Sequence, residues 1–187
     1  MRPVIVQQYA VSLDGFSCPD DSEFQKYVFG VEDPELDEYF LADLRRAGTH
    51  VMGRVTYENM SAYWPGQENA IAGVMNGIPK VVFSRTLEHA DWPESRIASG
   101  DTAHELALLK AEPGGEILVH GGYRFTQSLV QMGLVDEIRL YVFPVALGSG
   151  QSLFGTLRTL TKYSVSGFRV FSSGAVLQRL RPATIAG

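Results

Sequence analysis

Cysteine is nearly absent from this chain of 187 residues, which contains only Cys18. A disulfide framework within one chain is therefore excluded, and a reducing compartment is favoured. Long hydrophobic runs are also missing, because no apolar stretch approaches the ~20 residues that a membrane-spanning helix needs. The opening residues, MRPVIVQQYAVSLDG, lack the apolar segment and cleavage site of a secretory signal. We therefore expect a cytoplasmic protein that does not enter a membrane.

An excess of positive charge is missing as well. The chain has 16 lysines and arginines against 21 acidic residues, which gives a net charge of −5. We therefore expect no binding to nucleic acid or to an anionic membrane surface, although a small anionic ligand needs only a few local cations. The histidines His50, His89, His104 and His120 lie far apart and show no ligand spacing, so the sequence predicts no metal site.

What the chain does have is an alternation of short apolar segments and segments with helical periodicity. This alternation predicts a single α/β domain over residues 1–187, with a mostly parallel sheet between two layers of helices and a C-terminal antiparallel hairpin. Strands are expected at 4–13, 49–52, 80–84, 116–120 and 137–143, and the hairpin at 163–181. Helices are expected from Asp33-Pro34 to Gly48, from Gly53 to about 65, from a capping box at Thr102 and Glu105 to 109, and from 123 to 132. Residues 16–32 show no clear period and are expected to form a long loop, with or without a helical turn.

Three of the expected strands end in small, hydroxyl-bearing or cationic residues. These residues are Gly53, Arg54 and Thr56 after the second strand, Ser84 and Arg85 after the third, and Gly121 and Gly122 after the fourth. Ligands of open α/β sheets bind outside the carboxyl ends of strands, and helix N-termini bind phosphates. Taken singly, glycine at such a turn often serves packing, and a lone arginine is often a solvated surface residue. Together the three turns indicate a phosphate-rich nucleotide, although the G-x-G-x-x-G and G-x-x-x-x-G-K-[ST] fingerprints are absent.

Five motifs, SLDGF, VMGRVTYE, VVFSRT, ILVHGG and LVDEIRLYVFPVALGSGQSLF, occur in this order. As an ordered set over about residues 3–181 they resemble the dihydrofolate-reductase-like superfamily, and most closely the RibD C-terminal reductase domain of riboflavin biosynthesis. The resemblance implies a dihydrofolate-reductase-like fold, an NADPH-dependent reductase acting on a small molecule, and a homodimer. The deaminase half of the bifunctional family members is missing, because no H-x-E motif with a P-C-x-x-C partner is present.

The resemblance also implies roles for individual residues. Arg54 and Thr56 would hold phosphates, and Ser84 and Arg85 would bind the 2′-phosphate that distinguishes NADPH from NADH. Gly121 and Gly122, with the amides of Tyr123 and Arg124, would hold the diphosphate. Ala10 and the loop after Asp14 would line the nicotinamide.

Two candidate catalytic acids remain open. Dihydrofolate reductases carry a carboxylate on their first helix, and counting from Phe40 places Leu36 there, whereas counting from Gly53 places Asp37 there. Asp14 either contacts a polar substrate or forms a plain Asp-Gly turn.

The substrate implied by the resemblance is a ribosylamino-pyrimidine phosphate. The loop at 16–32 offers only Lys26 against Asp20, Asp21, Glu23 and Glu32, which favours a different native substrate. Dihydrofolate reduction and a non-catalytic nucleotide-binding role are the alternatives.

Overall fold

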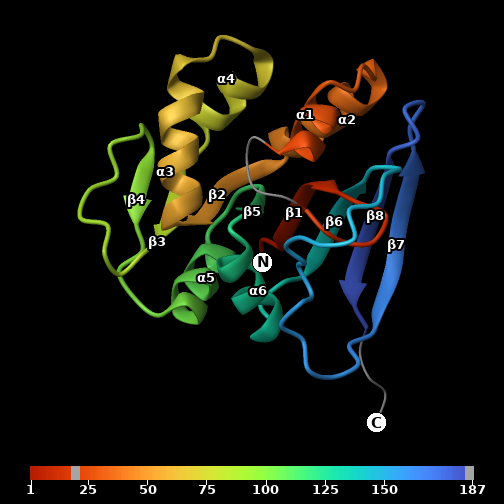
Figure 1. Ribbon diagram of the computed structural model, residues 1–187. Coiled ribbons are helices and arrows are strands. Elements are labelled where there is room, and N and C mark those ends of the chain that lie inside the picture. Colours follow the sequence, from red (N-terminus) through yellow and green to blue (C-terminus); the bar gives the residue numbers. More distant parts are fainter. Residues whose placement is uncertain (18–21, 184–187) are drawn as a thin grey trace.

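A single sheet of eight strands organises the protein, which is described by a computed structural model for residues 1–17 and 22–183 (Figure 1). The strands lie in the order β4-β3-β2-β5-β1-β6-β8-β7. Their bounds are β1 Val4–Val11, β2 Ala47–Gly53, β3 Lys80–Phe83, β4 Ser95–Ile97, β5 Glu116–His120, β6 Glu137–Val142, β7 Tyr163–Val170 and β8 Val176–Pro182. Strands β1 to β6 pair in parallel, whereas β8 pairs antiparallel with both β6 and β7.

Helices cover both faces of this sheet, with α1 to α4 on one side and α5 and α6 on the other (Figure 1). Their bounds are α1 Glu23–Phe29, α2 Pro34–Arg45, α3 Arg54–Tyr63, α4 Ala70–Gly77, α5 Thr102–Ala111 and α6 Tyr123–Gln131, with a 3-10 turn η1 at Trp64–Gly66. The predicted α/β class, the largely parallel sheet and the closing antiparallel hairpin are thus confirmed. None of the described helices is long and apolar enough to cross a membrane.

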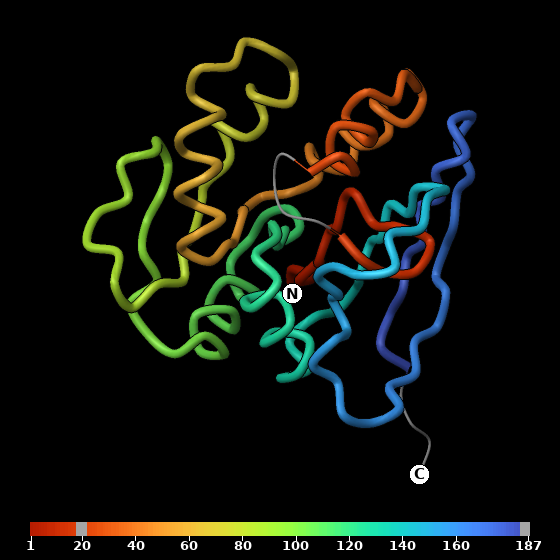
Figure 2. The backbone as a smooth tube through the Cα atoms, viewed as in Figure 1, coloured from red at the N-terminus to blue at the C-terminus, as the bar shows by residue number. Residues whose placement is uncertain are grey.

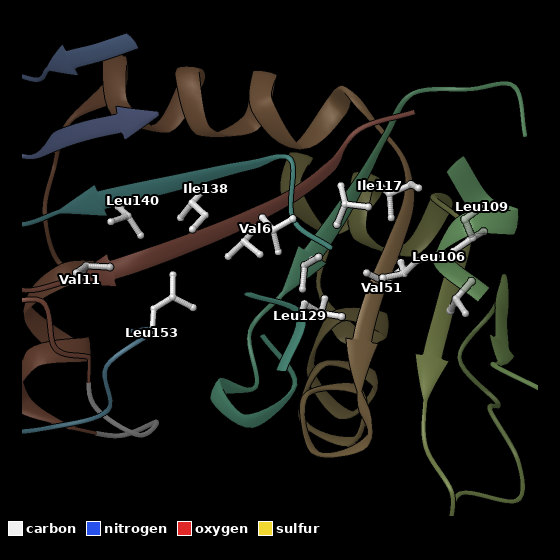
Figure 3. Packing of buried hydrophobic residues seen from close by; sticks show 14 residues of the cluster. Val6, Val11, Val51, Leu106, Leu109, Ile117, Leu129, Ile138, Leu140 and Leu153 are labelled. Carbon is white, nitrogen blue, oxygen red and sulfur yellow. The ribbon is translucent and has the colours of Figure 1, made fainter. Parts of the chain in front are cut away.

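The core forms because alternate strand residues point to opposite faces of the sheet. On the α5–α6 face, Val6, Val51 and Ile117 pack with Leu106 of α5 and Leu129 of α6 (Figure 3). On the other face, Ile5 and Leu118 pack against Leu44 of α2, and Met52 and Val82 pack against Tyr57 of α3 and Met75 of α4. Apolar side chains therefore pack on both faces of the central strands, as a sheet buried on two sides requires.

Several elements differ from the expectation. Residues 16–32, expected as a long loop with at most a helical turn, contain the 7-residue helix α1, whose Phe24 and Val28 are buried against Tyr141 and Phe143. Helix α4 and strand β4 were not expected at all. Helix α2 ends at Arg45 rather than at Gly48, because Gly48 already belongs to β2.

The expected capping box of α5 is also wrong by one residue. Asp101 is the N-cap, and its carboxylate accepts hydrogen bonds from the N–H groups of Ala103 and His104 at 2.9 and 3.3 Å. Thr102 is the first residue of the helix itself.

The C-terminal hairpin folds back along the edge of the sheet beside β6 (Figure 2). Its turn is tied to α2, because the buried carboxylate of Asp33 accepts a hydrogen bond from Ser173 N–H at 2.8 Å and another from Leu36 N–H at 3.1 Å. Asp33 therefore caps α2 and fixes the hairpin with the same side chain. The predicted helix start at Asp33-Pro34 is confirmed.

Candidate functional site

The three predicted turns lie next to one another because β3, β2 and β5 are neighbours in the sheet. A Cβ atom placed on Gly122 would come within 2.7 Å of Thr56 Oγ1, so the turn after β5 rests directly on the first turn of α3. Similarly, a Cβ atom on Gly53 would lie 3.3 Å from Phe125 Cβ in α6. The N-termini of α3 and α6 are therefore in contact at the carboxyl edge of the sheet.

These two helices are the α-helices of the described chain that begin without a side-chain cap. The other four are capped by Ser22, Asp33, Asn69 and Asp101, whereas α3 begins at Gly53 and α6 at Gly122. Unpaired N–H groups in a first turn and the positive end of the helix dipole together favour an anion. Gly122 has φ 73°, a left-handed conformation that glycine adopts at little cost.

The turn after β3 carries a hydroxyl and a cation. Ser84 Oγ accepts hydrogen bonds from the N–H groups of Thr86 (3.1 Å) and Leu87 (2.9 Å), which folds the turn and leaves the hydroxyl proton for another acceptor. The stacked rings of Phe83 and Phe125, with centroids 5.0 Å apart, hold this turn against α6.

Three arginines surround the turns, and all three are exposed. Arg54 is held by Glu58, with Nη1 at 2.8 Å from Oε1. Arg85 and Arg124 make no ion pair with any residue in the ranges 1–17 and 22–183. The cationic side chains at this edge are thus partly uncommitted, as an anion site requires.

Ala10 lies on the next strand, β1, and has φ 62°, which is uncommon for a residue with a side chain. The register between β1 and β6 shifts between Gln8 and Val11, so Ala10 sits in a bulge. Bulges and positive φ angles of this kind are concentrated near functional sites, where they re-aim the backbone.

Asp14 follows β1 and ties it to the loop after β6. Its carboxylate accepts hydrogen bonds from Ser12 Oγ (2.6 Å) and from the N–H groups of Leu147 (3.1 Å) and Gly148 (2.6 Å). These bonds, led by that of Ser12, lower the pKa of Asp14 to about 2. Asp14 is therefore ionised at neutral pH and anchors two loops, and its contact with a substrate stays a prediction.

Leu36 and Asp37, the two candidates on the first helix, have opposite environments. Leu36 is 1% exposed and packs in the core, whereas Asp37 is exposed in the first turn of α2. Burial, followed by the charges of Asp37 and Asp33, raises the pKa of Tyr9 to about 12. Of the two candidates, only Asp37 therefore carries a charge that affects Tyr9 in β1. Its catalytic role stays a prediction.

A row of buried polar side chains crosses the sheet just before the glycines, and sequence reasoning missed it. Gln7 of β1 is paired in register with His120 of β5, and His50 of β2 with Lys80 of β3. The two imidazole rings are 4.4 Å apart. Gln7 Oε1, both ring nitrogens of His50 and His120 Nε2 have no hydrogen-bond partner among the described residues.

Burial is the largest cause of the pKa shifts of the titratable groups in this row. It lowers the pKa of His120 to about 4, and it lowers that of His50 well below the usual value, helped in both cases by the charge of Lys80. Burial also lowers the pKa of Lys80 to about 8. Both imidazoles are therefore neutral at physiological pH.

Two cavities accompany these features. One of about 40 Å³ lies between the end of β1 and α6, and its lining includes Gln8, Phe16 and Tyr123. Such a volume accommodates water but not a heterocycle, which needs at least ~300 Å³. A larger one of about 470 Å³ lies at the opposite edge, beside the buried ion pair of Arg139 with Glu116, and is therefore separate from the three turns.

No cluster of three or more metal-ligating residues occurs within residues 1–17 and 22–183. Cys18 lies outside these ranges.

Comparison with known proteins places this architecture in a family. The model of the RibD C-terminal domain matches residues 3–177. YyaP of Bacillus subtilis (strain 168), an uncharacterized protein, is 30% identical over 177 residues, which cover 92% of this chain and 91% of YyaP. YwjB of the same organism, also uncharacterized, is 29% identical over 185 residues, which cover 97% of this chain and 99% of YwjB.

Solved structures share the fold. A pyrimidine reductase-like protein of Corynebacterium diphtheriae has a TM-score of 0.69 at 14% identity, with 97% of this chain and 92% of that chain covered. A deaminase/reductase of Thermotoga maritima has a TM-score of 0.66 at 17% identity, and this chain spans 57% of its length. With a family match over nearly its whole length, the chain belongs to the RibD C-terminal domain family.

Proposed function

We propose that the protein is an NADPH-dependent reductase that transfers a hydride to a small heterocyclic substrate. The observation that carries this proposal is the contact between the two uncapped helix N-termini, α3 and α6, beside the Ser84-Arg85 turn. Membership of a family with reductase domains supports the same activity.

The residues fit a dinucleotide with a 2′-phosphate. The hydroxyl of Ser84 and the guanidinium of Arg85 would bind the 2′-phosphate, since a planar guanidinium and a hydroxyl donor suit a phosphate monoester. The first turns of α3 and α6, with Arg54, Thr56 and the amides of Tyr123 and Arg124, would hold the diphosphate. The glycines Gly53, Gly121 and Gly122 would let that group approach the backbone.

Bound NADPH would supply the hydride, and the protein would supply orientation. A ligand laid along β3, β2 and β5 continues onto β1, the next strand, where Ala10 lies in its bulge. Ala10 would line the nicotinamide, and Asp14 and Asp37 would stand on the substrate side.

The activity is tested by following NADPH oxidation with three acceptors. These are 5-amino-6-(5-phosphoribosylamino)uracil, its unphosphorylated form and dihydrofolate. Oxidation that depends on a pyrimidine acceptor supports the proposal, whereas no oxidation with any acceptor despite tight NADPH binding indicates a non-catalytic nucleotide-binding module.

Dihydrofolate reduction is the second candidate, because Asp37 is exposed near the end of β1. It requires turnover of dihydrofolate and tight binding of methotrexate. Absence of methotrexate binding at high micromolar concentration rules this candidate out.

The homodimer and the cytoplasmic location stay predictions. Sedimentation of the purified chain measures the first, and fractionation of the source cells measures the second.

A further inference from the structure

We propose that the acceptor of this enzyme is a planar heterocycle without a phosphate group, neutral or positively charged. The inference rests on the proposed reductase function and concerns the substrate half of the same site. It follows from how rings and charges are distributed on the two sides of Ala10.

The acceptor side is fixed by the order of the strands. A dinucleotide over β3, β2 and β5 would bring its redox-active end to β1, so the acceptor must lie beyond β1, towards β6 and the α1–α2 pair. The side chain of Tyr9 lies there in a group of aromatic rings. Its ring centroid is 4.5 Å from that of Phe40, 5.3 Å from Tyr141, 5.5 Å from Phe143 and 6.1 Å from Phe29.

This aromatic group is open on one side. Tyr9 is half-buried, and Phe29 is 70% exposed although its ring stacks on Tyr9. An exposed aromatic surface beside a half-buried tyrosine favours a flat apolar ligand, because offset stacking stabilises ring pairs beyond the burial of area alone.

The charge on this side is strongly negative. The described residues 3–17 and 22–44 contain eight carboxylates and one basic residue, Lys26. One of the eight, Asp43, is buried and paired with Arg46, Arg139 and Arg179, which leaves seven without an arginine cluster around them. The arginines that contact Tyr39 are already paired, Arg169 with Glu35 and Arg179 with Asp43. Asp14 and Asp33 are ionised, because hydrogen bonds lower the pKa of each to about 2.

The electrostatic effect is visible at Tyr9 itself. Besides burial, the groups that raise the pKa of its hydroxyl are Asp37 and Asp33, and no cation opposes them. A phosphate dianion placed here would meet the same repulsion, whereas a neutral or cationic ring would not.

The cofactor side carries positive charge instead, because Arg54, Arg85 and Arg124 are exposed around the three turns. The site is therefore polarised, with cations where phosphates of the dinucleotide would lie and carboxylates where the acceptor would lie. Gln7 provides an independent feature. Its Oε1 lies on the same face of β1 as Tyr9, is buried and has no hydrogen-bond partner among the described residues. A ring with an N–H group could donate a hydrogen bond to this oxygen.

The test compares two ligands that differ only in the phosphate. Binding of 5-amino-6-(ribosylamino)uracil and of its 5′-phosphate to the full chain is measured by calorimetry, with saturating NADP⁺ and again without it. We expect the unphosphorylated ligand to bind about tenfold more tightly at low salt, and this preference to shrink at about 0.5 M salt, where exposed charges are screened.

Two variants locate the effect. Asp37→Asn should reduce the preference about threefold by improving binding of the phosphate ester. Glu38→Gln, an exposed acid at the next position of α2, is the matched control and should change the preference much less.

Equal or tighter binding of the phosphorylated ligand would overturn the inference, and so would failure of both ligands to bind. Loss of NADP⁺ binding would instead count against the proposed function, since the ligand comparison without cofactor still tests the charge argument.

Discussion

Arg85 is the residue expected to distinguish NADPH from NADH most directly. It is exposed beside Ser84 and has no ion pair with a described residue, so its charge is available to a 2′-phosphate. Arg85→Ala should weaken NADPH about 10- to 100-fold, the range expected for loss of a charged hydrogen bond, and leave NADH nearly unchanged. Fluorescence titration with both cofactors measures this. Arg45→Ala, at the other end of the strands, is the control, and equal losses for both cofactors would contradict the assignment.

The buried imidazoles make a separate prediction about pH. The pKa of His120 is lowered to about 4 in the folded protein, below its unfolded value near 6.5, so the folded state excludes a proton that the unfolded chain binds. Stability should therefore fall as pH drops from about 6.5 to about 4, with a contribution of up to about 1.4 kcal/mol per pH unit from this group.

Urea unfolding across this pH range tests the effect. His120→Gln should flatten the dependence, and His89→Gln, an exposed histidine, should not. A wild-type stability that stays constant between pH 6.5 and 4.5 would show that the ring is not protected from protonation.

Sequence reasoning located the turn residues but not this histidine pair, and the reason is physical. Glycines, hydroxyls and arginines directly after apolar strands are local signals, so Gly53, Ser84 and Gly122 could be found without knowing the strand order. The contact between His50 and His120 depends on β2 lying beside β5, which is set by the whole sheet. The choice between Leu36 and Asp37 depends on which position of the first helix faces the site. Counting from Phe40 and counting from Gly53 give positions that differ by one residue, so the sequence alone does not decide between them.

At the scale of elements, the start of α6 carries the strongest constraint. Gly122→Ala would place a Cβ atom 2.7 Å from Thr56 Oγ1 at φ 73°, which should cost about 1–2 kcal/mol of stability and displace the first turn. We expect NADPH affinity to fall at least about tenfold, because the amides of that turn would no longer be aligned.

Gly133→Ala is the matched control at the other end of the same helix. Gly133 has φ 67° and no atom within 4 Å of an added Cβ, so the substitution carries similar backbone strain without the clash. It should lower the melting temperature and leave NADPH affinity unchanged. If both variants lose affinity equally, the effect belongs to helix stability and not to the turn.

The elements that sequence reasoning missed are short. Helix α1 spans 7 residues, α4 8 and β4 3, so local periodicity was too weak to reveal them. They exist because larger elements provide partners, as Phe24 and Val28 of α1 show by packing on residues of β6 and its following loop.

At the scale of the whole molecule, the sheet interleaves distant parts of the chain. β1 lies between β5 and β6, and β8 closes on β6, so the centre of the sheet cannot form from one half of the sequence. We expect a single cooperative unfolding transition, with saturating NADPH at 100 times its Kd adding about 2.7 kcal/mol of stability. Calorimetry that resolved two independent transitions, only one of them sensitive to NADPH, would contradict a single domain.

The most direct measurement of the central claim is a crystal structure with NADP⁺ bound. The 2′-phosphate should lie at Ser84 and Arg85, the diphosphate over Gly121 and Gly122 at the starts of α3 and α6, and the nicotinamide beside Ala10. A dinucleotide bound elsewhere, for example in the charged cavity at the opposite edge of the sheet, would contradict it.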